Sequence, residues 1–137
     1  MIICVCVDDS LGMSFNRRRQ SRDKAQILRL IETAGERRIF ASEYSMPLFT
    51  ELGIENVHPT RDFCEAGDDD ICFFELEHII EYAHRAEGYI LYRWNRKYPS
   101  DKKFPFDLEK KGFALTQSFD FCGNSHDKIT EEVWKKK

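Results

Sequence analysis

Four arginines occupy positions 17, 18, 19 and 22, directly before a segment with helical spacing of apolar residues. Guanidinium groups donate forked hydrogen bonds that match phosphate and carboxylate groups, and the N-terminus of a following helix adds main-chain donors. We therefore expect this segment to bind an anionic ligand such as a nucleotide, a pterin-like compound or an RNA segment. The residues expected to hold the ligand are Arg17, Arg18, Arg19, Gln20, Ser21 and Arg22.

A simpler interpretation of the same segment is structural. Its arginines would then lie in a solvated loop and pair with surface acids, while Ser21 or Asp23 caps the helix. Gln26 would complete a capping box with Asp23. A helix cap does not require four arginines, so we keep both hypotheses for this segment: an anion-binding site and a solvated loop that caps the helix.

His126 lies in a second polar segment, together with Asn124, Ser125 and Lys128. A histidine beside cationic side chains could act as a general acid or base in phosphodiester cleavage that needs no metal, with arginine or lysine stabilising the transition state. The alternative function is therefore a small metal-independent ribonuclease that uses His126 and the arginines. The structural interpretation is an ordinary turn between two strands.

Two further clusters are better explained by structure than by chemistry. The segment 93–98 mixes cations with aromatic residues and could stack on bases, but aromatic residues at the end of a strand are more often packed against the core. The residues Glu75, Glu77, His78, Glu81 and His84 contain metal-ligand types, yet a metal needs three or four converging ligands. We expect a charged helix surface there and no metal.

A third hypothesis concerns a protein partner. The acidic segment 65–81 would then be the contact surface of a protein-binding inhibitor.

The overall composition is that of a globular protein. The chain has 137 residues, 42% of them hydrophobic, and a formal net charge of −3. Proteins that bind nucleic acid over a large surface usually carry an excess of lysine and arginine. This chain has no such excess, so any anion site must be confined to one small region. The five cysteines form no Cys-x-x-Cys pair and suit a reducing compartment. We expect a soluble, cytoplasmic protein with one domain over 1–137, no membrane contact, and a small anionic ligand or RNA segment as partner.

Strands and helices are expected to alternate along the chain. Apolar runs predict strands over 1–7, 37–41, 54–58, 71–74 and 88–94, and helical spacing predicts helices over 23–34, 45–52 and 77–85. The segment 8–22 is expected to be a loop, and 113–119 and 128–134 an antiparallel strand pair. The pattern favours an α/β fold with a mixed, mostly parallel central sheet flanked by helices.

Both ends of the sequence resemble the dihydrofolate reductase family. The C-terminal likeness lies in the strand 89–94, the Asp101-Lys-Lys-Phe104-Pro105 element, the strand 113–118 and the closing strand 128–134. Near the N-terminus, an apolar strand followed by Asp9-Ser-Leu-Gly12-Met13 is similar to that family's first strand and the mobile loop over its substrate. The resemblance implies a dihydrofolate-reductase-like fold. It also places Asp23 near the family's substrate-binding carboxylate, so Asp23 joins His126 as a candidate catalytic residue.

The sequence departs from that family where the cofactor would bind. The family places two glycines after a central strand so that the backbone can approach the pyrophosphate. Here the run 71–74 continues into Glu75-Leu76-Glu77, no glycine lies between Gly67 and Gly88, and Arg18-Arg19-Gln20 replaces the family's Pro-Trp pair. A carboxylate at this position repels phosphate. We therefore expect no cofactor and no NADPH-dependent reduction.

A stretch of the form Arg-Arg-Gln-Ser-x-Asp and the ending around Ser125-His126 also resemble small bacterial proteins that carry the label ribonuclease Z. Members of that enzyme class bind two zinc ions through a His-x-His-x-Asp-His cluster. The histidines here are His58, His78, His84 and His126, and no two are separated by a single residue. The sequence therefore lacks the ligands on which that chemistry depends.

Overall fold

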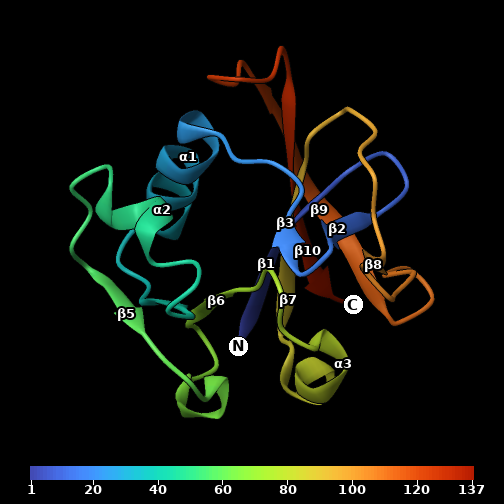
Figure 1. Cartoon of the computed structure of the whole chain (residues 1–137). Coiled ribbons are helices and arrows are strands. Elements are labelled where there is room, and N and C mark those ends of the chain that lie inside the picture. Colours follow the sequence, from blue (N-terminus) through green and yellow to red (C-terminus); the bar gives the residue numbers. More distant parts are fainter.

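The computed structural model describes residues 1–137 and is built around a seven-stranded sheet with the order β5-β4-β6-β1-β7-β10-β9 (Figure 1). The strands are β1 (Ile2–Val7), β4 (Ile39–Ala41), β5 (Val57–Pro59), β6 (Ile71–Phe73), β7 (Gly88–Arg93), β9 (Phe113–Phe121) and β10 (Ile129–Lys136). The first five of these pair in parallel, and β10 pairs antiparallel with both β7 and β9. The expected mostly parallel α/β sheet with a C-terminal antiparallel pair is confirmed.

The two faces of the sheet carry separate cores. Successive residues of a strand point to opposite faces, so Ile3, Val5 and Val7 pack on one side and Cys4 on the other. The helices α1 (Lys24–Ala34) and α2 (Pro47–Thr50) cover the Cys4 face. The short helix α3 (Ile79–Tyr82), which continues into the 3-10 turn η2 (Ala83–Arg85), covers the Val5 face together with the 3-10 turn η1 (Phe63–Glu65).

Helix α1 buries Ile27, Leu30 and Ala34 against the sheet, whereas Leu28 is 53% exposed. Leu28 faces solvent because one residue after Ile27 the helix has turned by about 100°. None of the helices combines the length and the apolar character that crossing a bilayer requires.

A buried carboxylate fixes α1 on the sheet. Glu131 of β10 accepts hydrogen bonds from Arg29 at 3.0 and 3.2 Å, from Thr33 Oγ1 at 2.7 Å and from the Tyr92 hydroxyl at 2.7 Å. All of the donors come from α1 or from the neighbouring strand β7. A buried charge is tolerated when it is paired and fully hydrogen-bonded, so this network holds the middle and the C-terminal end of α1 against the sheet.

The segment 8–22 is not an irregular loop, which corrects the expectation from the sequence. It contains β2 (Gly12–Phe15) and β3 (Arg18–Arg19), and β2 also pairs with β8 (Lys102–Lys103). Asn16 and Arg17 both have positive φ, at 52° and 59°, which suits the two-residue turn of a hairpin. These strands are too short for an alternating apolar pattern, so the sequence carries no signal for them.

Candidate active site

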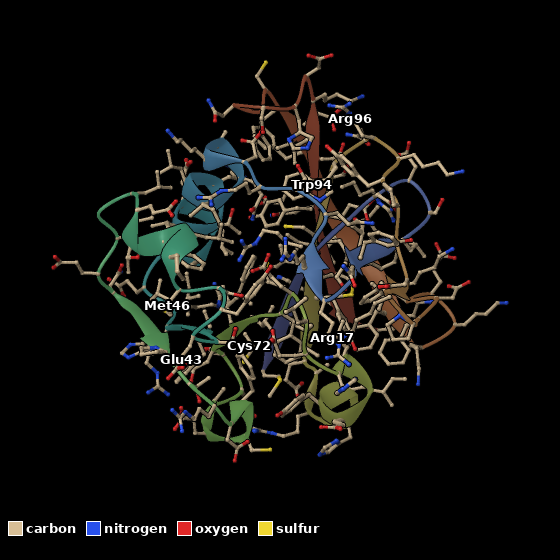
Figure 2. All side chains as sticks on the ribbon, in the orientation of Figure 1. Arg17, Glu43, Met46, Cys72, Trp94 and Arg96 are labelled. Atoms are coloured by element: carbon tan, nitrogen blue, oxygen red, sulfur yellow. The ribbon has the colours of Figure 1, made fainter.

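Three chain segments meet where β7 ends and α1 begins. They are the residues before α1, the segment after β7 that contains Trp94 and Tyr98, and the loop between β9 and β10 that contains His126. Figure 2 shows Trp94 and Arg96 toward this end of the molecule, and Figure 1 places the β9–β10 loop there. The two candidate catalytic residues, Asp23 and His126, come together at this point.

Asp23 is a buried carboxylate surrounded by donors. As the N-cap of α1 it accepts the Ala25 amide at 2.8 Å, and it also accepts the amides of Asn124 at 2.8 Å and Ser125 at 2.7 Å. Burial opposes the charged form, but these bonds and the one from His126 outweigh it and lower the pKa of Asp23 from 3.8 to about 2. Asp23 is therefore ionised at neutral pH and acts only as an acceptor.

The contact between Asp23 and His126 assigns the proton positions on the imidazole. Nδ1 of His126 lies 3.0 Å from Oδ2 of Asp23, and the side chains are 1% and 0% exposed. Because the carboxylate only accepts, Nδ1 of His126 carries the hydrogen and donates it. In the neutral ring Nε2 is then an acceptor with one lone pair.

Two hydroxyl groups face that lone pair. Nε2 of His126 lies 3.1 Å from Ser21 Oγ and 2.8 Å from the Tyr98 hydroxyl, and the two oxygens are 3.4 Å apart. Ser21 and Tyr98 are half-buried, so these hydroxyls lie between the enclosed imidazole and the solvent. A carboxylate, an imidazole and a serine hydroxyl in hydrogen-bonding sequence form the arrangement that activates serine nucleophiles.

Packing and a second carboxylate hold this set in place. The Trp94 ring stacks on His126 with centroids 4.5 Å apart and an interplanar angle of 16°. Oδ2 of Asp8 accepts the Tyr98 amide at 3.0 Å and the Gln20 side chain at 3.3 Å. Asp8 follows β1 directly, so it connects the segments that carry Ser21 and Tyr98 to the centre of the sheet.

The arginines of the 16–23 segment do not point to one place. Arg19 forms two hydrogen bonds with Glu75, at 2.8 and 3.0 Å, and Arg22 pairs with Glu51. Arg17 and Arg18 form no ion pair and lie in and beside the turn of the β2–β3 hairpin. In Figure 2 Arg17 and Arg96 lie well apart.

The cap expected for α1 is half present. Asp23 caps the helix, but Gln26 forms no bond to it. Instead Nε2 of Gln26 is buried without a partner. Gln20 uses its amide nitrogen to reach Asp8 and the Pro99 carbonyl oxygen.

The position after β6, where the resembling family binds its dinucleotide, does not fit such a cofactor. Glu75 is buried there, and its carboxylate accepts Arg19 and, at 2.7 Å, the Ser45 hydroxyl. Phosphate binding would require main-chain amides and glycines at this point. Here the position holds the negative Glu75 carboxylate, and the nearby Arg19 guanidinium is already paired with it.

The two remaining clusters of the sequence analysis are the segment 93–98 and the acidic and histidine residues between 75 and 84. Trp94 is buried, as the packing interpretation predicts. No group of three or more histidine, cysteine, aspartate or glutamate side chains is arranged to hold a metal ion.

Comparison with known proteins identifies the fold. No family model matches the chain, and no curated protein does. A solved structure of dihydrofolate reductase from Enterococcus faecalis, complexed with NADP(H) and RAB-propyl, aligns with a TM-score of 0.64 at 8% identity, over 98% of this chain and 95% of that one. The dihydrofolate-reductase-like fold is thus confirmed. None of these comparisons supports the likeness to proteins labelled ribonuclease Z.

Sequence reasoning did not find the roles of Asp8 and Tyr98. Asp8 directly follows the first predicted strand, and a carboxylate at the end of a central strand is a signal that could have marked it. Tyr98 lies 28 residues from His126, and nothing in the local pattern links the two residues.

Proposed function

We propose that this chain, which has the fold of dihydrofolate reductase, is a hydrolase of anionic esters. Ser21 is its nucleophile, His126 its general base, and Asp23 the residue that orients and polarises His126. The observation that carries the proposal is the continuous chain of contacts from Asp23 Oδ2 to His126 Nδ1 at 3.0 Å and from His126 Nε2 to Ser21 Oγ at 3.1 Å.

The reaction follows from these positions. Ser21 Oγ attacks the acyl carbon or phosphorus of the ester while His126 Nε2 takes its proton, and the ester bond to the leaving alcohol breaks as that proton passes to the alcohol oxygen. Water then attacks the Ser21 ester, with His126 again accepting and returning a proton. Ionised Asp23 stabilises the imidazolium in both steps. None of these steps needs a metal ion.

The surrounding charges favour an anionic substrate. Arg96 lies over the Tyr98 ring, with its guanidinium carbon 5.5 Å from the ring centroid. Arg22 adjoins Ser21, and its ion pair with Glu51 joins side chains that are 49% and 54% exposed. Exposed pairs contribute little free energy, so Arg22 can exchange Glu51 for a phosphate or carboxylate of the substrate.

Hydrolysis assays on matched variants test the proposal. The wild-type chain should release nitrophenol from bis(p-nitrophenyl) phosphate or a carboxylated nitrophenyl ester in the presence of a chelator. Ser21→Ala and His126→Asn should lose this activity, whereas His84→Asn, which changes an exposed histidine, should retain it. Absence of hydrolysis in the wild type, or equal rates in Ser21→Ala, would contradict the proposal.

A second candidate is ribonuclease activity. It is favoured by the two hydroxyls that lie within hydrogen-bond distance of Nε2 of His126, because either oxygen is placed to donate its proton to this atom. The 2′-hydroxyl of RNA would take the place of the Ser21 hydroxyl, lose its proton to Nε2 of His126 and attack the adjacent phosphorus. The bond from that phosphorus to the 5′-oxygen of the next nucleotide would break as the proton passes to that oxygen. In that case Ser21→Ala still cleaves an RNA oligonucleotide, and only His126→Asn abolishes cleavage.

A further inference from the structure

A cavity of about 410 Å³ lies outside the carboxyl ends of β4, β5 and β6. It is lined by residues that directly follow β4 and β5, by the two residues before α3, and by residues of η1 and α3. Its volume falls within the range of small-molecule sites, about 300–1,000 Å³, and the carboxyl edge of parallel strands is where such sites form in open α/β sheets. It shares no lining residue with Ser21, Tyr98 or His126.

Aromatic rings form part of its wall. Tyr44, Phe63 and Tyr82 all line the cavity, and Phe63 meets Tyr82 edge to face with centroids 5.9 Å apart. The Tyr44 hydroxyl accepts the Arg19 amide at 3.0 Å, which fixes the position of its ring. The negative faces of such rings attract cations as well as other rings.

The charged groups of the wall are mostly negative. Glu43 forms an exposed pair with Arg61 at 3.4 Å, but Glu77 and Glu81 have no ion-pair partner. Glu77 is half-buried. The neighbouring Lys102 ammonium donates instead to main-chain carbonyl oxygens, those of Leu76 and Glu77, at 2.5 Å each.

The state of Glu77 gives a second indication. Burial raises the pKa of the Glu77 carboxyl above its ordinary value, and the pKa stays raised although the Glu75 amide donates to this carboxyl at 2.9 Å and the Lys102 charge favours its ionised form. A partly desolvated carboxylate that forms no direct ion pair is costly in the free protein. A bound cation would remove that cost.

We propose that this cavity binds a small aromatic cation, such as an amidinium or ammonium group attached to a ring. The ring packs among Tyr44, Phe63 and Tyr82, and the cation pairs with Glu77 and Glu81. His78, which also lines the cavity, lies between these two carboxylates in the sequence. The site is independent of the proposed hydrolase.

Calorimetric titration of the full chain with benzamidine, benzamide and benzoate at pH 7.5 tests the proposal. These probes share the ring and differ in charge. Benzamidine should bind at least about tenfold more tightly than benzamide, and benzoate should not bind. Equal affinities for benzamidine and benzamide, or no benzamidine binding at millimolar concentration, would overturn the proposal.

Variants then locate the site. Glu77→Gln and Glu81→Gln should each weaken benzamidine binding about tenfold, while Glu55→Gln, at an exposed position away from the cavity, should leave the affinity unchanged. Glu81 is itself exposed, so its variant remains informative if Glu77→Gln does not fold. Unchanged affinity in Glu81→Gln would contradict the assignment.

Discussion

Nδ1 of His126 lies 3.0 Å from Oδ2 of Asp23, although 103 residues separate them along the chain. One residue begins α1 and the other lies in the loop between the last two strands, so only the completed fold joins them. The same carboxylate caps the helix, accepts two amides of the loop and orients the imidazole. A single residue therefore links the stability of this end of the molecule to its proposed chemistry.

Acid should weaken the folded state through Asp23. Its pKa is lowered from 3.8 to about 2, so its stabilising effect is present above pH 4 and is lost as the pH falls from about 4 to about 2. The shift corresponds to about 2 kcal/mol. Urea unfolding at pH 7, 4 and 2 should show this loss in the wild type. Asp23→Asn should be about 2 kcal/mol less stable at pH 7 and change less with pH. An equally steep pH dependence in Asp23→Asn would contradict this role.

Gly123→Ala should disturb the site through a steric clash. A Cβ atom at position 123 would lie 2.6 Å from Asp23 Oδ2 and 2.6 Å from the His126 carbonyl oxygen. We expect a loss of about 1–3 kcal/mol in the free energy of unfolding and a changed NMR signal for the His126 ring. Gly67→Ala is the control, because its nearest new contact, with Asp70, is an ordinary 3.4 Å. Equal effects of the two substitutions would refute this explanation.

Tyr98→Phe should increase the reactivity of Ser21. The tyrosine hydroxyl, at 2.8 Å, competes with the serine hydroxyl, at 3.1 Å, for the one lone pair on His126 Nε2. Removing the competitor leaves Ser21 as the sole donor, and modification of Ser21 by a phosphonate reagent should become roughly threefold faster. A slower reaction would mean that Tyr98 assists the nucleophile instead.

The pair of Arg19 and Glu75 should be energetically coupled. It is bidentate, and side chains that are 20% and 9% exposed form it. We measure a double-mutant cycle with Arg19→Met and Glu75→Met. The losses of unfolding free energy in the two single variants should add up to more than the loss in the double variant. The coupling free energy should be about 1–3 kcal/mol, measured by urea unfolding. A coupling near zero would show that the contact does not hold the β2–β3 hairpin to the sheet.

The fold could be predicted from the sequence because its strongest signals are local. Each buried segment carries a pattern that can be recognised without the rest of the chain. The examples are the apolar runs of β1, β6 and β7 and the helical spacing of apolar residues in α1. The β2–β3 hairpin lacked such a signal because main-chain bonds and a positive-φ turn form it.

The site could be predicted only in part. The sequence marks His126 as a possible general acid or base, Asp23 through the family resemblance, and Ser21 only as a ligand-binding residue or helix cap. Their convergence depends on the register of β9 and β10 and on the position of α1 above the sheet. The pairing of Arg19 with Glu75 joins two segments 56 residues apart, and no local pattern encodes it. Of the arginines whose spacing suggests a common anion site, Arg19 pairs with Glu75 and Arg22 with Glu51, whereas Arg17 and Arg18 pair with no acid.

Covalent labelling of Ser21 tests the central claim most directly. An activated serine attacks a fluorophosphonate and displaces fluoride, and the adduct is located by mass spectrometry. The account predicts one adduct on Ser21 of the folded chain. The adduct should be absent in Ser21→Ala, about 100-fold slower to form in His126→Asn, and unaffected in Ser118→Ala. Folded protein that stays unlabelled at Ser21, or labels equally fast without His126, would contradict it.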